Sequence, residues 1–424
     1  MKRLTYIFIT SILSISIFTS CGTNSNNNIV NISILNSKPE ISNALNNAIE
    51  QFTEENENIN IKIVKYSQTS SYKEKLNSLN ASDNMPTLSL IDASQIEEYK
   101  NICADLSSEK WVNDISGGAS DIAKNDNGDI IAFPFATEGI GFIYNKKVID
   151  EAGIDIKNIN TISALEDAFQ KINSIGKEAL IITNEEWSLG DHFLSTFYSV
   201  DSKNFDSKKK YFEDLKSNAS NLKDNSILNG LLDIFDLMKK YNMYSESPLT
   251  PSYDKCAEVL GKGEVGFWYM GNWASQNILN NSNGNNDFGF IPVPISNSSS
   301  DYGNNEISIG TTKYFIIDKN NSLEQQEAAK QFLDYLVYNE EGNKFLVEDC
   351  GIIPGFSNIN ISQSDPLVNE IITFRDNGKT TELMNSYLPS NNSTVLGHAL
   401  KKYLNNEISR EDLIKQISDF WSQS

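Results

Sequence analysis

Short apolar runs alternate with amphipathic stretches along the chain, and the two patterns predict alternating strands and helices. The apolar runs predict strands over residues 31–35, 59–64, 87–91 and 179–182. Between the first two, apolar side chains recur at helical spacing at Ile41, Leu45, Ile49 and Phe52. Strand, helix and strand in this order is typical of parallel βαβ units, whose loops at the carboxyl ends of the strands line ligand crevices. We therefore predict an α/β fold.

Two later helices carry a start signal as well as an apolar face. Ser163 precedes Glu166 by three residues, which predicts a capping box ahead of an inward face formed by Leu165, Phe169 and Ile172. Ser322 and Gln325 repeat this spacing before Ala329, Phe332, Leu333 and Leu336. The strand–helix alternation is therefore expected to continue through both segments.

Length and charge limit the classes of protein and partner. The chain has 424 residues, of which 39% are hydrophobic and 21% charged, so it can bury a sizeable core and is long enough for two domains. Its formal net charge of −21 makes nucleic-acid backbones and anionic lipid surfaces poor partners.

Cysteines and histidines predict neither a disulfide framework nor a metal site. Three cysteines follow the N-terminal segment, Cys103, Cys256 and Cys350, and none is part of a CxxC pair. We expect them to be buried free thiols. His192 and His398 are far apart in sequence and lack neighbouring cysteines, so we expect no metal and no cofactor.

The N-terminal segment resembles a lipoprotein signal peptide. Lys2 and Arg3 precede a mostly apolar stretch from Leu4 to Phe18, and Phe18-Thr19-Ser20 leads into Cys21. The resemblance implies that residues 1–20 are removed and that Cys21 is acylated, which would anchor the protein to the outer face of the cell membrane. A plain secretory peptide is the alternative, and a transmembrane anchor is disfavoured because the apolar run is too short. Residues 21–28 are polar and predict a flexible tether, or a disordered N-terminus without lipid.

Four segments carry a resemblance to a known family. Residues 131–146 pass through Pro134 and end in Tyr-Asn-Lys; residues 257–273 contain a glycine turn, an apolar strand and a Gly-x-Trp end. Residues 287–294 end in two spaced prolines, and residues 350–354 form a Gly-x-x-Pro turn. In this order, the segments resemble extracellular solute-binding proteins of ABC transporters, in the maltose-type, carbohydrate-binding family.

The resemblance implies two discontinuous α/β lobes, joined by hinge strands, around a central ligand cleft. We assign residues 29–136 and 311–356 to lobe 1, and residues 138–308 and 358–424 to lobe 2. The chain is expected to cross between the lobes at residues 136–141 and 307–312, and again just after Gly355.

The same resemblance names candidate ligand-binding residues. Trp273, preceded by Asn272, matches a tryptophan that stacks on sugar in the family; its alternative role is an aromatic plug beneath the strand end. Glu138 falls where the family places a ligand-binding carboxylate, and a charge on the hinge surface is the alternative. Weaker candidates are Trp187, Asp92 and Ser94, for which core or surface roles stay open.

Two other segments bear on these assignments. Trp268 is out of step with Phe267 and Tyr269, so we predict that it packs against a neighbouring helix. Residues 388–393 lack the stacking aromatic that maltose-type members often carry there, which disfavours maltodextrin and leaves a smaller or differently shaped saccharide.

These observations predict a binding protein with no catalytic residues. Acidic pairs such as Glu185-Glu186 raise the alternative of a glycoside hydrolase, but adjacent side chains point in different directions, and no G-x-S-x-G, HExxH or P-loop pattern occurs. A structural adhesin would show repeats, which this chain lacks. We expect a monomer that captures a sugar or oligosaccharide and delivers it to an ABC-transporter permease. A polyamine or a glycerophosphodiester is the alternative ligand.

Overall fold

The computed structural model describes residues 29–66, 72–116, 118–360 and 365–424. The predicted signal segment, Cys21 and the tether lie outside these residues.

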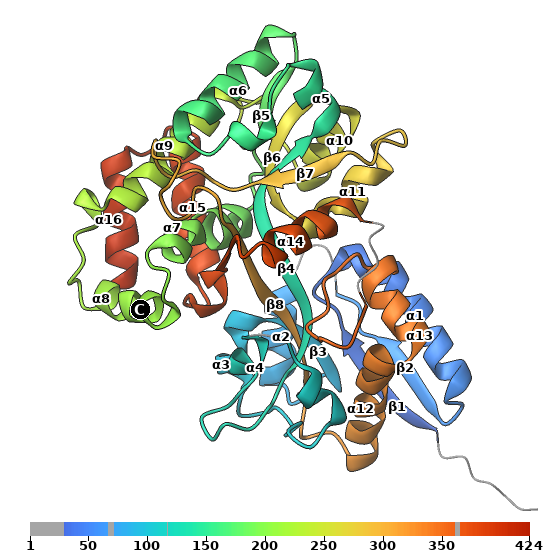
Figure 1. Ribbon diagram of the computed structural model, residues 1–424. Coiled ribbons are helices and arrows are strands. Elements are labelled where there is room, and N and C mark those ends of the chain that lie inside the picture. Colours follow the sequence, from blue (N-terminus) through green and yellow to red (C-terminus); the bar gives the residue numbers. More distant parts are fainter. Residues whose placement is uncertain (1–28, 67–71, 117, 361–364) are drawn as a thin grey trace, which may run out of the picture.

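The described residues form one nine-stranded sheet that passes through both halves of the molecule (Figure 1). Its main path is β2-β1-β3-β8-β4-β6-β5, with β7 paired to β4 and β9 paired to β8. The strands are β1 Val30–Leu35, β2 Ile59–Ile63, β3 Leu88–Asp92, β4 Phe133–Asn145, β5 Glu178–Ile181, β6 Val265–Gly271, β7 Phe288–Ile291, β8 Ile307–Ile317 and β9 Thr380–Glu382. The four strands predicted from the early apolar runs are confirmed as β1, β2, β3 and β5.

Helices cover both halves of this sheet. They are α1 Ser42–Glu55, α2 Tyr72–Ala81, α3 Ile96–Tyr99, α4 Ala119–Ile122, α5 Lys146–Glu151, α6 Ile162–Ser174, α7 Ser195–Val200, α8 Phe205–Lys216, α9 Ser226–Tyr241, α10 Tyr253–Lys262, α11 Ser275–Asn280, α12 Leu323–Tyr338, α13 Glu340–Lys344, α14 Pro366–Asp376, α15 Asn392–Leu404 and α16 Arg410–Trp421. Shorter helical segments include η2 Ala93–Gln95 and η5 Trp187–Phe193.

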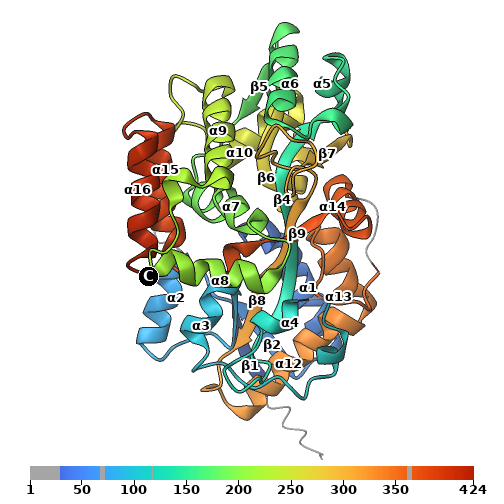
Figure 2. The same cartoon turned by 60° about the vertical axis from the view of Figure 1, so that its left-hand side comes forward.

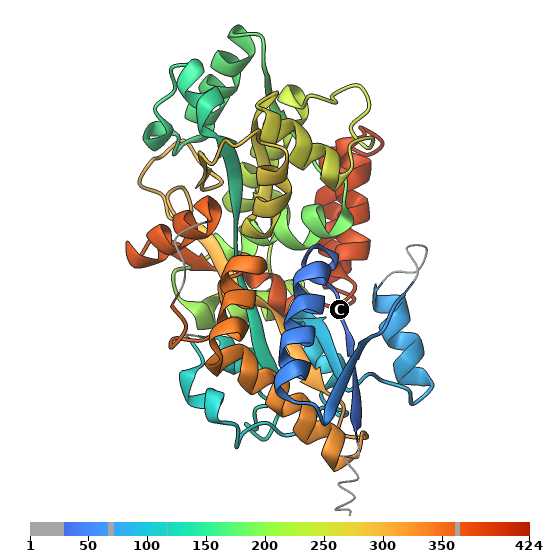
Figure 3. The ribbon, with the colours of Figure 1, turned by 90° about the vertical axis from the view of Figure 1, so that its right-hand side faces the viewer.

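The first half is built around the parallel strands β2, β1 and β3. The N-terminal helix α1 and the much later helices α12 and α13 lie together over this sheet (Figure 3). The predicted inward residues of α1 and α12 are buried because both helices turn their apolar faces to the same core. Segments almost 300 residues apart in sequence therefore share one hydrophobic core.

The second half is built around β5 and β6, which are parallel, and β4 and β7. The C-terminal helices α15 and α16 return to pack beside α7, α8 and α9 (Figure 2). This half contains two hydrophobic clusters, one of which includes Leu165, Phe169 and Ile172 of α6. All three predicted inward residues of α6 are fully buried.

The two predicted capping boxes have different outcomes. Ser322 caps α12 and accepts a hydrogen bond from the backbone N–H of Gln325, as predicted. The prediction for Ser163 is wrong because α6 begins two residues earlier, with Thr161 as its N-cap. Ser163 instead donates its hydroxyl to Asn297 Oδ1 at 2.9 Å.

Predictions for four buried side chains are confirmed. Cys103, Cys256 and Cys350 are free and buried. Trp268 is fully buried, and its ring contacts Tyr253 at the start of α10 with ring centroids 5.3 Å apart. Trp268 thus packs against a helix, and its Nε1 donates to Thr183 Oγ1 at 2.7 Å.

The antiparallel strands β4 and β8 join the two halves. Phe133 and Phe135 of β4 lie in the first core, whereas Phe142 and Tyr144 lie in a core of the second half. Both strands run continuously from one half to the other between the surrounding helices (Figure 1). The predicted α/β fold with two discontinuous lobes is confirmed, and the shared strands place residues from both lobes beside one another.

Candidate ligand-binding site

The middle of β4 and β8 presents different side chains on its two faces. Side chains alternate along a strand, and two register shifts on either side of Ala136 interrupt this alternation locally. On one face, the Thr312 hydroxyl donates to the carboxylate of Glu138. On the other face, the hydroxyl oxygens of Thr137 and Thr311 lie 2.9 Å apart. We call these the front face and the rear face, respectively.

Glu138 is the centre of a buried ion network on the front face. It is 3% exposed, and its Oε1 lies 2.8 Å from Lys38 Nζ, which is also 2.8 Å from Glu40 Oε1. Burial alone would raise the pKa of Glu138, but the ammonium groups of Lys38 and Lys313 lower it below its usual value. Burial opposes the charge on Lys38, yet the two carboxylates outweigh it and raise the lysine pKa. Both groups are therefore charged at neutral pH.

A second ion pair lies beside this network. Asp92 ends β3 and pairs with Lys313 of β8, and the Asp92 side chain is about half exposed. Ser94 follows in η2 and is half-buried. Asp92 thus lies at the front face, and sequence reasoning missed its partner Lys313.

An aromatic cluster completes the front face from the second lobe. The ring centroid of His192 lies 5.0 Å from that of Trp273 and 5.3 Å from that of Trp187, and the two tryptophans are 6.2 Å apart. Tyr253 adds a further ring 6.2 Å from Trp187. All four residues are half-buried. Their interplanar angles of 52° to 69° leave the rings tilted rather than stacked on one another.

Lys38 connects the ion network to the aromatic cluster. Its Nζ lies over the ring of Trp273, 5.9 Å from the centroid, although the two residues come from different lobes. A second interlobe contact runs from Lys73 Nζ of α2 to the backbone oxygen of Ser390, at 3.0 Å. The lobes therefore meet across the front face.

Several buried polar atoms of this cluster have no hydrogen-bond partner within the described part of the chain. They are the hydroxyl of Tyr253, Nδ1 of His192 and Nδ2 of Asn272. The carbonyl oxygen of Asn272 does have one, since it accepts from the backbone N–H of Gly139 at 2.9 Å. Buried polar groups are nearly always paired in native proteins, so these atoms lack a hydrogen-bond partner that water or a ligand hydroxyl group could supply.

Two titratable groups on η5 are perturbed by their surroundings. Burial lowers the pKa of His192 to about 4, so its imidazole is neutral at pH 7. Burial raises the pKa of Asp191 to about 7, and the nearby charge of Asp92 contributes to the same shift. Asp191 also accepts a hydrogen bond from Asn392 Nδ2 at 2.8 Å. A neutral imidazole and a carboxyl group that is half protonated near neutrality can both donate and accept hydrogen bonds.

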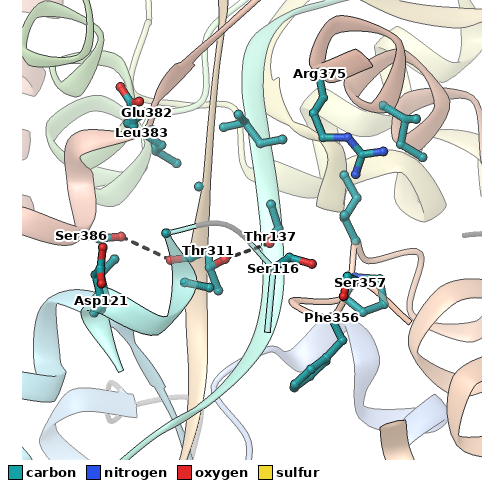
Figure 4. Close-up of a pocket in the computed structure, with 18 of the residues that line it drawn as sticks. Ser116, Asp121, Thr137, Thr311, Phe356, Ser357, Arg375, Glu382, Leu383 and Ser386 are labelled. Atoms are coloured by element: carbon teal, nitrogen blue, oxygen red, sulfur yellow. Dashed lines mark hydrogen bonds between the residues drawn. The ribbon is translucent and has the colours of Figure 1, made fainter. Parts of the chain in front are cut away.

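A cavity of about 810 Å³ lies at the rear face. Thr137 and Thr311 line its floor, and residues from both lobes form its walls (Figure 4). The front-face cluster of Glu138, Trp273 and Trp187 is absent from its lining. The molecule thus has two distinct regions where its lobes meet, one on each face of the shared strands.

Neither membrane spans nor metal sites are found within the described ranges. Across these residues, no helix combines the length and the apolar character needed to cross a membrane. The same residues contain no group of three or more His, Cys, Asp or Glu side chains that could hold a metal ion.

Two α/β lobes that share strands, with an aromatic and charged site between them, define a protein that encloses a ligand. Residues 47–370 match the model of the bacterial extracellular solute-binding protein family. The chain belongs to this family. The match confirms the prediction of an extracellular binding protein over an enzyme.

Known proteins are similar to this chain in sequence and in fold. The melibiose/raffinose/stachyose-binding protein MelE of Bacillus subtilis is 21% identical over 334 residues, which cover 75% of this chain and 72% of MelE. A solved structure of the binding protein RafE in complex with raffinose has a TM-score of 0.78, at 17% identity, and covers 93% of this chain and 99% of RafE. A sugar transporter from Bacillus licheniformis in complex with stachyose has a TM-score of 0.74, at 19% identity, and covers 93% of this chain and 100% of the transporter chain.

Proposed function

We propose that this protein is the sugar- or oligosaccharide-binding component of an ABC importer. In this proposal, lobe 1 (residues 29–136 and 311–356) and lobe 2 (residues 138–308 and 358–424) close about β4 and β8, and the ligand is held at the front face. The closed complex then delivers the ligand to the permease. The observation that carries the proposal is the aromatic cluster with unpartnered polar atoms, next to charged groups that are already ion-paired.

The charged groups of the front face are already ion-paired, which favours a neutral ligand. Lys38 and Lys313 are each paired with carboxylates, so neither ammonium is left for the phosphate of a glycerophosphodiester. Glu138 and Glu40 share Lys38, and Asp92 pairs with Lys313, so a polyamine would have to displace an ammonium that is already bound. Hydroxyl groups can instead join these ion pairs as hydrogen-bond donors and acceptors without breaking them.

Within this site, we assign Trp273 as the stacking platform and Trp187 as a second aromatic wall. The apolar face of a pyranose ring suits a half-buried indole, and tilted neighbouring rings can enclose the edge of the sugar. Glu138, Asp92, Ser94 and Asn272 then contact sugar hydroxyls. The names of the relatives support a galactoside such as raffinose, stachyose or melibiose as the first ligand to test.

Thermal-shift screening followed by calorimetry tests the proposal. The panel contains raffinose, stachyose, melibiose and maltotriose, with spermidine and glycerophosphocholine as the alternative ligand classes. A ligand that binds only the folded protein raises its melting midpoint. We expect at least one neutral saccharide to raise it, and a shift by spermidine or glycerophosphocholine alone would contradict the proposal.

We also propose that acylated Cys21 anchors the protein to the outer face of the cell membrane. The lipobox-like Phe18-Thr19-Ser20-Cys21 sequence supports this step. Cys21→Ser is expected to move the protein out of the membrane fraction or to leave an uncleaved precursor. Normal processing and unchanged fractionation of Cys21→Ser would contradict lipid anchoring.

A further inference from the structure

The rear cavity has the size and lining of a ligand site rather than of a packing defect. Its volume of about 810 Å³ is within the range of small-molecule pockets, which extends from roughly 300 to 1,000 Å³. Several large apolar side chains that line it are only half-buried: Phe205, Tyr387 and Ile309. Phe205 and Tyr387 contact each other edge to face, with ring centroids 5.3 Å apart. An apolar body placed against this pair and Ile309 would remove their exposed surface from water.

The cavity also has one charge that is available to a ligand. Arg375, near the end of α14, projects toward the cavity (Figure 4). Its Nε donates to Asp376 Oδ1 at 3.0 Å, and its two terminal nitrogens have no partner among the residues that the structure describes. Both carboxylates in the lining already have a lysine partner, since Glu382 pairs with Lys208 and Asp121 pairs with Lys124. The two terminal nitrogens of Arg375 can therefore bind an anion, and a guanidinium fork fits a carboxylate.

We propose that the rear cavity binds an amphipathic organic anion, with a carboxylate at Arg375 and an aromatic or short aliphatic body against Phe205 and Tyr387. This second site is separate from the front face, since the lining residues and the front-face cluster lie on opposite faces of β4 and β8. Both lobes contribute to this rear site. Phe356 belongs to the hydrophobic core of the first lobe, whereas Phe205 and Tyr387 pack against a hydrophobic cluster of the second lobe.

The position of the cavity couples it to lobe closure. In this structure the lobes touch at the front, through Lys38 with Trp273 and Lys73 with Ser390, while the rear remains open. Rotation about shared strands that separates the front contacts brings the rear walls together and reduces the cavity. A rear ligand therefore favours the front-closed state and strengthens binding at the front, and by linkage the front ligand strengthens binding at the rear.

A matched pair of probes tests the site directly. We would titrate the purified protein with 4-phenylbutyrate and with its uncharged analogue 4-phenylbutyramide, by calorimetry and ligand-observed NMR. Saturable binding of the carboxylate is expected, with the amide about tenfold weaker because it lacks the charged partner for Arg375. An absence of saturable binding, or equal affinities for the two probes, would overturn the proposal.

Variants assign the binding to this cavity. Arg375→Met should weaken the carboxylate about tenfold and leave the amide unchanged. Lys379→Met is the matched control, because Lys379 lies shortly after α14 and outside the lining; it should affect neither probe. Ile309→Trp, verified by its melting curve, should fill the cavity and abolish binding of both probes. Retained binding in Ile309→Trp, or an equal effect of Lys379→Met, would show that the probes bind elsewhere.

Saccharide titration tests the coupling between the rear cavity and the front face. Saturating 4-phenylbutyrate should lower the dissociation constant of a saccharide that binds the front site, and an unchanged constant would refute the coupling. If every saccharide fails to bind, the proposed function fails, while the probe titrations still decide whether the rear site exists.

Discussion

Replacing Trp273 by alanine separates ligand binding from folding. The ring of Trp273 is half-buried, it contacts His192 and Trp187, and it packs at the edge of both hydrophobic clusters of the second half rather than inside either one. If the ring is the stacking platform, its loss should cost about 2 kcal/mol of binding free energy, which raises the dissociation constant roughly 30-fold. The free energy of unfolding should fall by only about 1 kcal/mol, because little core packing is removed.

Trp268 provides the matched control for this experiment. It lies five residues earlier, is fully buried and donates to Thr183. Trp268→Ala should therefore cost about 3 to 5 kcal/mol of folding stability. Calorimetric titration with raffinose and stachyose, together with denaturant unfolding of both variants, measures the two effects. Unchanged saccharide affinity in Trp273→Ala, or a stability loss as large as that of Trp268→Ala, would place Trp273 in the core and refute the stacking role.

Three further substitutions test the front face. Glu138→Gln should lower unfolding stability at pH 7 by about 3 kcal/mol, because it leaves Lys38 buried with a weaker partner; equal denaturant midpoints would contradict the buried pair. Asp191→Asn should flatten the pH dependence of stability. A raised folded pKa means that the folded state holds its proton after the unfolded chain has lost it, so wild-type stability should fall as pH rises from about 4 to about 7. Urea unfolding measures the free energy of unfolding of both proteins across this pH range. If it changed equally with pH in wild type and in Asp191→Asn, the raised pKa of Asp191 would be contradicted. Gly271→Ala should weaken saccharide binding at least tenfold, because a Cβ at this position would lie 1.8 Å from the Trp273 ring and displace it; titration with unchanged affinity would contradict that geometry.

Local patterns predicted much of the fold because they act through neighbouring residues. The apolar runs of β1, β2 and β3 and the helical spacing in α1 depend on period alone, and the structure confirms them. The N-cap of α6 was predicted wrongly because Thr161 and Ser163 are both suitable N-cap residues. Thr161 caps the helix, and Ser163 instead forms a hydrogen bond with Asn297. Propensity alone does not distinguish two such residues.

Long-range partners of the site could not be predicted in the same way. Glu138 was a candidate from its segment, but its ion pair with Lys38 joins residues 100 positions apart. Tyr253 and His192 were missed because neither belongs to a motif, although each contacts Trp187 in the folded chain. The scarcity of histidine, with two in the chain, was the one available signal for His192. The rear cavity left no trace in the sequence, because its walls come from segments on both lobes.

The most direct test of the account is a crystal structure of the protein with the saccharide that gives the largest thermal shift. We expect one sugar ring against the face of Trp273, between the two lobes, with its hydroxyl groups within hydrogen-bond distance of Glu138 and of the unpartnered atoms of Tyr253, His192 and Asn272. A saccharide bound away from the front face, or held there without contact with Trp273 and Glu138, would contradict it.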